Sequence, residues 1–97
     1  MNDTKRKLAA IVFTDIVGFT KLSSKNEPAA LALLEKQRDL LKPIVEKNNG
    51  DWLKEIGDGL LLTFGTTRDA VDCAIEIQHA TKNIPDLNLR IGIHQGE

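Results

Sequence analysis

A glycine-rich turn between two strand-like stretches constrains this chain more than any other feature. Residues 53–56 and 60–64 favour β-structure, and Gly57-Asp58-Gly59 separates them. Asp-Gly between two such stretches predicts a tight β-hairpin. Asp58 is therefore either a turn-forming residue or a functional carboxylate held at a hairpin tip.

A second carboxylate follows another predicted strand. Residues 8–14 are apolar on both faces, which is typical of a central strand covered by helices, and Asp15 comes directly after them. Gly18 then allows a close backbone turn, and we expect a helix to begin nearby. The free N–H groups at the start of such a helix can cradle phosphate.

The remaining elements are two helices and a last strand. Apolar residues recur at helical spacing over residues 28–47, where Pro43 is expected to kink or divide the helix. Thr66 or Thr67, with Asp69, is expected to cap a further helix that ends near Lys82. Residues 87–94 alternate as a strand does. The order β-α-β-β-α-β predicts an α+β, ferredoxin-like fold with an antiparallel sheet.

This topology brings the two aspartates together. In the usual spatial strand order, 4-1-3-2, the first and third strands are neighbours, and the first strand ends beside the hairpin tip. Asp15 and Asp58 would then lie at one edge of the sheet. Paired carboxylates repel each other unless a cation lies between them. Mg²⁺ is commonly held by one or two carboxylates together with substrate phosphates, so the pattern predicts two-metal chemistry on a nucleotide.

Composition excludes several other classes of protein. A length of 97 residues suits one domain, and a net charge of -1 argues against a nucleic-acid-binding surface. The single Cys73 excludes an internal disulfide and is expected to be a buried structural thiol, while His79 and His94 have no evident metal-ligand partners. Residues 1–7 are expected to be a flexible polar lead-in. Without a membrane-length apolar run or a secretory signal, we expect a cytoplasmic setting.

Three segments together resemble the class III adenylate/guanylate cyclase catalytic domain. They are residues 13–20 (FTDIVGFT), 54–59 (KEIGDG) and 90–97 (RIGIHQGE), in the family's order. The resemblance covers residues 8–97 and implies a partial domain of this type, truncated after the fourth strand. It implies a two-metal conversion of ATP to 3′,5′-cyclic AMP and pyrophosphate, with Mg²⁺ or Mn²⁺ as the ions.

The resemblance also assigns roles to individual residues. Asp15 and Asp58 match the catalytic, metal-binding aspartates, and the carbonyl of Ile16 matches a further metal ligand. Arg90 resembles an arginine that reaches the β- and γ-phosphates from the partner strand. The triphosphate cradle corresponds to four consecutive backbone N–H groups, those of Val17, Gly18, Phe19 and Thr20.

Lys54 matches the position at which a side chain of this family contacts the purine ring of the substrate. Lysine is the adenine-selecting type, because it can donate to adenine N1, whereas a glutamate accepts from guanine. A one-residue slip would put Glu55 in this position, although Gly57-Asp58 favours Lys54. A solvated lysine at a strand edge is the alternative.

Active sites of this family lie between two catalytic domains, so the resemblance implies a homodimer. The groups that complete catalysis lie in a further stretch of the domain, so we expect these 97 residues alone to be inactive. Two alternatives stay open: a non-catalytic cyclase-like module for nucleotide binding or dimerisation, and a guanylate cyclase.

Overall fold

A computed structural model of the chain describes residues 9–96. Its strands are β1 (Ala10–Ile16), β2 (Gly50–Ile56), β3 (Gly59–Phe64) and β4 (Leu89–Gln95). Its helices are α1 (Phe19–Lys25), α2 (Glu27–Lys47) and α3 (Thr67–Thr81). The predicted α+β class and the predicted order of elements are confirmed, whereas the expected lead-in over residues 1–7 lies outside the described residues.

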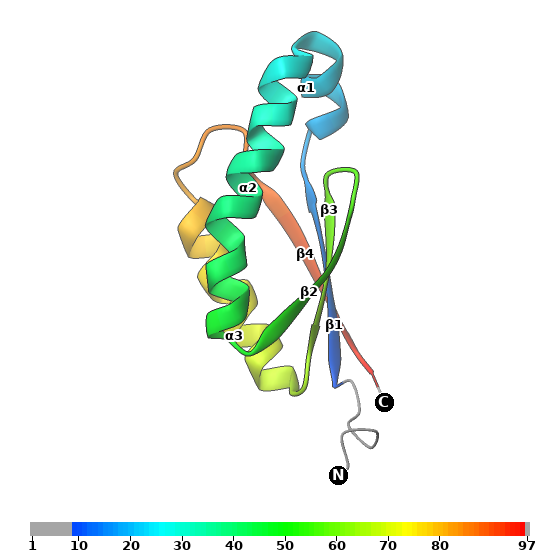
Figure 1. Cartoon of the computed structure of the whole chain (residues 1–97), viewed down its shortest axis with the longest axis vertical. Coiled ribbons are helices and arrows are strands. Elements are labelled where there is room, and N and C mark those ends of the chain that lie inside the picture. The colour runs from blue at the N-terminus through cyan, green and yellow to red at the C-terminus, as the bar shows by residue number, and fades with distance from the viewer. Residues whose placement is uncertain (1–8, 97) are drawn as a thin grey trace.

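The four strands form one antiparallel sheet in the order β2-β3-β1-β4, which confirms the predicted neighbours. Because β1 and β2 are both antiparallel to β3, they run in the same direction. The end of β1, the start of α1 and the tip of the β2–β3 hairpin therefore lie at the same end of the molecule (Figure 1).

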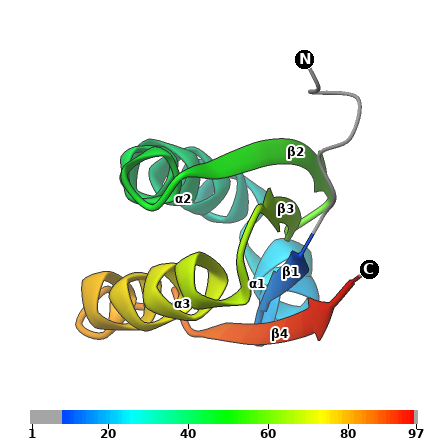
Figure 2. The ribbon, with the colours of Figure 1, turned by 90° about the horizontal axis from the view of Figure 1, so that it is seen from below.

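Helices α2 and α3 form a layer on one face of this sheet (Figure 2). The strand residues that point toward the helices alternate with those that point away, so Val12 is buried whereas Phe13 is 51% exposed. The expectation that helices cover both faces of β1 is therefore wrong within the described residues. The core lies between the sheet and the helices, and its largest members are Phe64, Leu41, Leu62, Ile77, Leu87, Val12 and Val45.

Caps define where the two long helices begin. The side chain of Asn26 accepts a hydrogen bond from the Ala29 N–H at the start of α2. Thr66 Oγ1 accepts from the Asp69 N–H at 3.0 Å at the start of α3, as the sequence predicted. Each cap satisfies one of the N–H groups that a helix leaves free in its first turn.

Pro43 lies inside α2 and does not divide it, so that part of the expectation is wrong. A proline removes one backbone hydrogen bond in a helix, but Pro43 is on the exposed side, where water can satisfy the freed carbonyl. Leu41 and Val45, on either side of it, are both buried in the core. Packing of this face offsets the lost hydrogen bond.

Cys73 is buried on α3, as expected. Burial raises the pKa of its thiol to about 11, with a smaller contribution from the negative charge of Glu76. The thiol is therefore neutral at physiological pH, which fits a structural role.

Gly50 marks the tightest packing between β2 and the core. A Cβ atom at this position would collide with the Phe64 ring and would lie 2.9 Å from Val45 Cγ1. Because both neighbours are buried, we expect Gly50→Ala to destabilise the fold by about 1–3 kcal/mol. Thermal denaturation measures this as a Tm lowered by roughly 4–8 °C per kcal/mol.

Gly65→Ala is the matched control, because a Cβ there meets nothing within 4 Å and Gly65 has no positive φ. Equal Tm values for the two variants would contradict this account of the packing around Phe64.

Candidate functional site

A pocket of about 220 Å³ lies at the end of the sheet where β1 stops. It brings together most of the candidate residues, namely Asp15, Ile16, Gly18, Phe19, Thr20, Asp58 and Arg90. Two candidates, Val17 and Lys54, do not line it. The two aspartates predicted to meet at one edge of the sheet therefore share one pocket.

Asp58 is held in place at the hairpin tip. Gly57 adopts a positive φ of 60°, which the tight turn requires and which favours glycine. The turn directs the Asp58 carboxylate at the end of β1, where Oδ2 accepts a hydrogen bond of 2.8 Å from the Ile16 N–H. This bond links the hairpin tip to β1, so the Asp58 carboxylate has a structural role.

Asp15 lies within β1, because the strand extends to Ile16 instead of ending at residue 14 as expected. It is directly opposite Arg90 on β4, and the Arg90 Nε–H donates to Asp15 Oδ1 at 2.9 Å. This hydrogen bond, with the negative charges of Asp15 and then Asp58, raises the pKa of the Arg90 guanidinium. Asp15 shares with Ile11 and Phe13 the face of β1 that points away from the helices. The alternation of side chains along the strand was therefore a signal in the sequence for the direction in which Asp15 points.

The backbone after β1 turns sharply into α1. Gly18 is left-handed, with φ 80°, and α1 begins at Phe19, so the N–H groups of its first turn have no partner within the helix. Val17 differs, because its N–H donates to the Asn88 carbonyl at 2.8 Å. The expected cradle of four free N–H groups therefore lacks the one from Val17, which is used to extend the contact between β1 and β4.

Lys54 lies on β2 at some distance from the pocket but on the same face of the sheet as Asp15. It is paired with Leu61 on β3, which in turn is paired with Phe13 on β1. Two strand spacings of about 4.8 Å thus separate Lys54 from β1, or roughly 10 Å. The side chain is exposed. A ligand would have to extend across β3 to contact both Lys54 and Asp15.

The pocket residues fit a hard divalent cation. Carboxylate oxygens suit Mg²⁺ and Mn²⁺, and Asp15 and Asp58 each use one oxygen in a protein hydrogen bond and have a second oxygen available. Residues 9–96 contain no group of three or more His, Cys, Asp or Glu side chains that could hold a metal ion. Ions here would therefore complete their coordination with phosphate and water oxygens.

The chain matches one protein family along its whole length. The family described as "Adenylate and Guanylate cyclase catalytic domain" matches residues 1–97. A protein of Rhizobium meliloti (strain 1021) named "Putative adenylate cyclase 3" is 34% identical over 96% of the chain. The Caenorhabditis elegans protein "Receptor-type guanylate cyclase gcy-13" is 30% identical over 89% of it.

A solved structure shares both sequence and fold with the chain. The adenylate/guanylate cyclase/hydrolase from Silicibacter pomeroyi is 34% identical, with a TM-score of 0.78 over 95% of this chain. The chain spans 58% of that structure, and 17% and 10% of the Rhizobium and Caenorhabditis relatives. Among the described residues, no helix has the length and apolar character needed to cross a membrane.

Two substitutions at Asp58 separate its structural role from the metal binding predicted for it. Asp58→Ala removes the acceptor for the Ile16 N–H, and we expect it to cost about 1–3 kcal/mol of folding free energy. Asp58→Asn keeps an acceptor oxygen but loses the charge, so we expect near-normal stability and at least a roughly tenfold weaker Mn²⁺ affinity. Thermal denaturation and Mn²⁺ titration by electron paramagnetic resonance measure the two effects. Unchanged Mn²⁺ binding by Asp58→Asn would remove Asp58 from the metal site.

Proposed function

The chain belongs to the adenylate and guanylate cyclase catalytic domain family, and from this premise we propose that it carries the metal-binding part of an adenylate cyclase. The reaction is the conversion of ATP to 3′,5′-cyclic AMP and pyrophosphate. The observation that carries the proposal is the meeting of Asp15 and Asp58 in one pocket beside the Gly18 turn. Carboxylates next to free backbone N–H groups provide for both the cations and the phosphates of a metal–nucleotide complex.

In this proposal the residues of the pocket have different roles in binding the metal ions and the nucleotide. Asp15, Asp58 and the carbonyl of Ile16 would hold two Mg²⁺ or Mn²⁺ ions. Such ions, when bound, lower the pKa of a coordinated hydroxyl and neutralise charge on phosphate oxygens. The N–H groups of Gly18, Phe19 and Thr20 would orient the triphosphate so that the 3′-oxygen of the ribose faces the α-phosphorus. A bond would then form between these two atoms while the proton of the 3′-hydroxyl passes to water, and the bond from the α-phosphorus to the pyrophosphate oxygen would break.

Arg90 would stabilise the charge that develops on the leaving pyrophosphate. In the structure its guanidinium donates to Asp15, and 72% of the Arg90 side chain is exposed. Solvent weakens an ion pair this exposed, so the guanidinium can exchange Asp15 for phosphate oxygens at little cost.

Lys54 would select adenine by donating to N1 of the ring. Its place on the same face as Asp15, two strands away, leaves room for a nucleotide laid across β3. GTP is the second candidate substrate, because a receptor-type guanylate cyclase is among the relatives and Glu55, the guanine-type residue, is adjacent to Lys54.

A second catalytic domain is the proposed partner, in a homodimer. The sheet face that carries Asp15 also exposes large apolar side chains, with Phe13 51% and Ile56 60% exposed. Apolar surface of this kind is typical of an interaction site. Because the chain spans only part of its relatives, a non-catalytic module that binds nucleotide through the same face is the alternative function.

The proposal is tested by metal-dependent nucleotide binding and by product formation. We expect the 97-residue chain to bind ATP only when Mg²⁺ or Mn²⁺ is present. We also expect it to form little cyclic AMP alone, because it spans only 58% of the related solved structure and the reaction rate depends on groups that act only in the transition state. Calorimetry measures binding, and mass spectrometry quantifies the cyclic nucleotides. ATP binding that does not change in the absence of divalent ions would contradict the proposal.

A substitution at Lys54 tests the choice of purine. We expect Lys54→Glu to weaken ATP binding by roughly tenfold or more and to favour GTP, because a lost hydrogen-bond partner strongly changes discrimination. Lys36→Glu is the matched control: it makes the same charge change on α2, and Lys36 is also exposed. Equal ATP affinity in Lys54→Glu and the unaltered chain would remove Lys54 from the site.

A further inference from the structure

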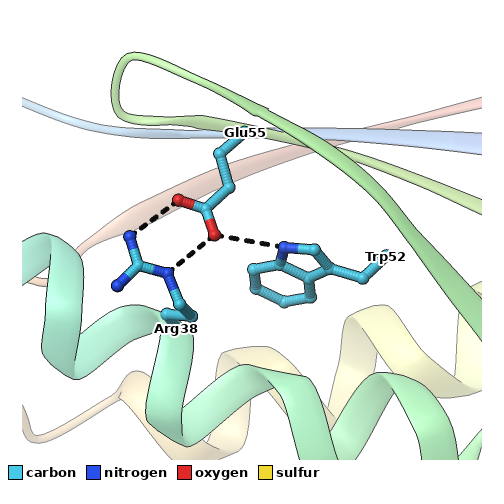
Figure 3. Close-up of polar contacts among 3 residues, drawn as sticks. All are labelled: Arg38, Trp52 and Glu55. Carbon is cyan, nitrogen blue, oxygen red and sulfur yellow. Dashed lines mark hydrogen bonds and ion pairs between the residues drawn. The ribbon is translucent and has the colours of Figure 1, made fainter.

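Three side chains form a polar cluster between α2 and β2, the Arg38–Glu55–Trp52 cluster (Figure 3). Arg38 donates to both carboxylate oxygens of Glu55, from Nε at 2.8 Å and from Nη2 at 2.9 Å. The indole Nε1–H of Trp52 donates to Glu55 Oε2 at 3.2 Å. Lys42 Nζ, also on α2, lies 5.7 Å from the centroid of the Trp52 ring. The cluster therefore holds β2 against α2 from both sides of Lys54.

The cluster depends on an irregularity in β2. The register with β3 pairs Trp52 with Leu62 and Lys54 with Leu61, so Leu53 is an extra residue in a β-bulge. In a regular strand, residues three apart point to opposite faces. The extra residue reverses this for Trp52 and Glu55, which both point toward α2 and can therefore bond to each other.

The bulge also determines the direction of Lys54, which lies between Trp52 and Glu55 in the sequence. With the bulge, Lys54 shares the face of Leu61 and Phe13, away from the helices. Without it, continuous alternation from Trp52 would put Lys54 opposite Leu60 on the helix face, and Glu55 would point to the open face. A one-residue change of register thus exchanges a lysine for a glutamate on the face that carries Asp15.

We propose that Arg38 is a positioning residue for nucleotide selection: by holding Glu55 on the helix face it maintains the bulged register of β2 and presents Lys54, not Glu55, to the purine. The inference rests on the proposed function, since it concerns the purine contact of the same site. Arg38 does not itself face that side of the sheet.

One feature of β2 makes this restraint necessary, and the geometry of the Arg38–Glu55 contact makes it effective. Among the described residues, β2 pairs only with β3, and an edge strand with one partner can slip more readily than a central one. Glu55 also bonds Arg38 through both of its oxygens, the geometry in which a guanidinium gives most directional control. The hydrogen bond from Arg38 lowers the pKa of Glu55, so the carboxylate stays ionised and bound to Arg38 throughout the neutral range.

The register is tested first without nucleotide, by comparing Arg38→Met with Lys47→Met. Lys47→Met is the matched control, because it removes another ion pair of α2, the one with Glu76 at 2.8 Å, and leaves β2 untouched. Nuclear Overhauser contacts between the Lys54 and Leu61 side chains report the face on which Lys54 lies. Trp52, the only tryptophan in a chain without tyrosine, reports the cluster by its fluorescence. We expect loss of the Lys54–Leu61 contacts and a red-shifted emission in Arg38→Met alone.

Nucleotide preference is then measured as the ratio of ATP to GTP affinity in the presence of Mg²⁺. We expect Arg38→Met to lower this ratio roughly two- to fivefold, in line with the loss of a well-oriented but partly exposed ion pair. Arg38→Lys, which keeps the charge but not the two-point contact, should have an intermediate ratio. Lys47→Met should keep the ratio of the unaltered chain.

Deletion of Leu53 provides a rescue that a purely structural role of Arg38 would not predict. Without the extra residue, regular alternation from Trp52 already directs Lys54 to the open face and Glu55 to α2. We therefore expect Arg38→Met to leave the ATP-to-GTP ratio unchanged when it is made in the Leu53-deleted chain.

The outcomes separate this inference from the proposed function. Retained Lys54–Leu61 contacts in Arg38→Met, or an unchanged affinity ratio in that variant, would overturn the positioning role. An unaltered chain that binds neither ATP nor GTP would count against the proposed function, while the Overhauser contacts, which need no nucleotide, would still decide whether Arg38 holds the register.

Discussion

The antiparallel pairing of β1 with both β3 and β4 is the constraint on which the candidate site depends. Because β1 is central, its last residues are adjacent to the hairpin tip on one side and to the start of β4 on the other. Asp58 can then accept from the Ile16 N–H, and Arg90 can donate to Asp15. Each contact joins residues far apart in sequence. A different strand order would leave the same carboxylates without a common pocket.

The alternation of side chains along these strands separates stability from chemistry. Val12 and Ile16 are buried beneath the helices, whereas Asp15 and Phe13 point to the opposite face. The core can therefore be well packed while the open face carries charges and exposed apolar surface. The ion pairs on the open face and at the α2–β2 contact are solvent-exposed, and such pairs contribute little to folding free energy. Their main effect is on geometry, since they determine where Asp15 and Glu55 point.

Much of this arrangement could be predicted from local patterns. Hairpins, caps and amphipathic helices depend on residues close together in sequence, so Gly57-Asp58, the Thr66 cap and the apolar face of α3 were evident. Their order favoured one topology, and that topology placed Asp15 near Asp58. Boundaries were less accurate: β1 ends at Ile16 and not at residue 14, because pairing with β4 extends it through Asp15. The expectation that helices cover both faces of β1 was wrong, because apolar composition alone does not show which face of a strand a helix covers.

The sequence by itself thus indicated candidate residues for cations and phosphate, since their chemical types and local turns are encoded within a few positions, and its resemblance to a family added Lys54 as the candidate for the purine. Only the tertiary structure decided which of them are free to do so. Val17 uses its N–H on Asn88, and Arg90 is paired with Asp15. The bulge at Leu53 directs Lys54 to the open face and Glu55 to Arg38. The physical reason is that hydrogen bonds between strands, and between a strand and a helix, join distant residues whose register no local pattern specifies.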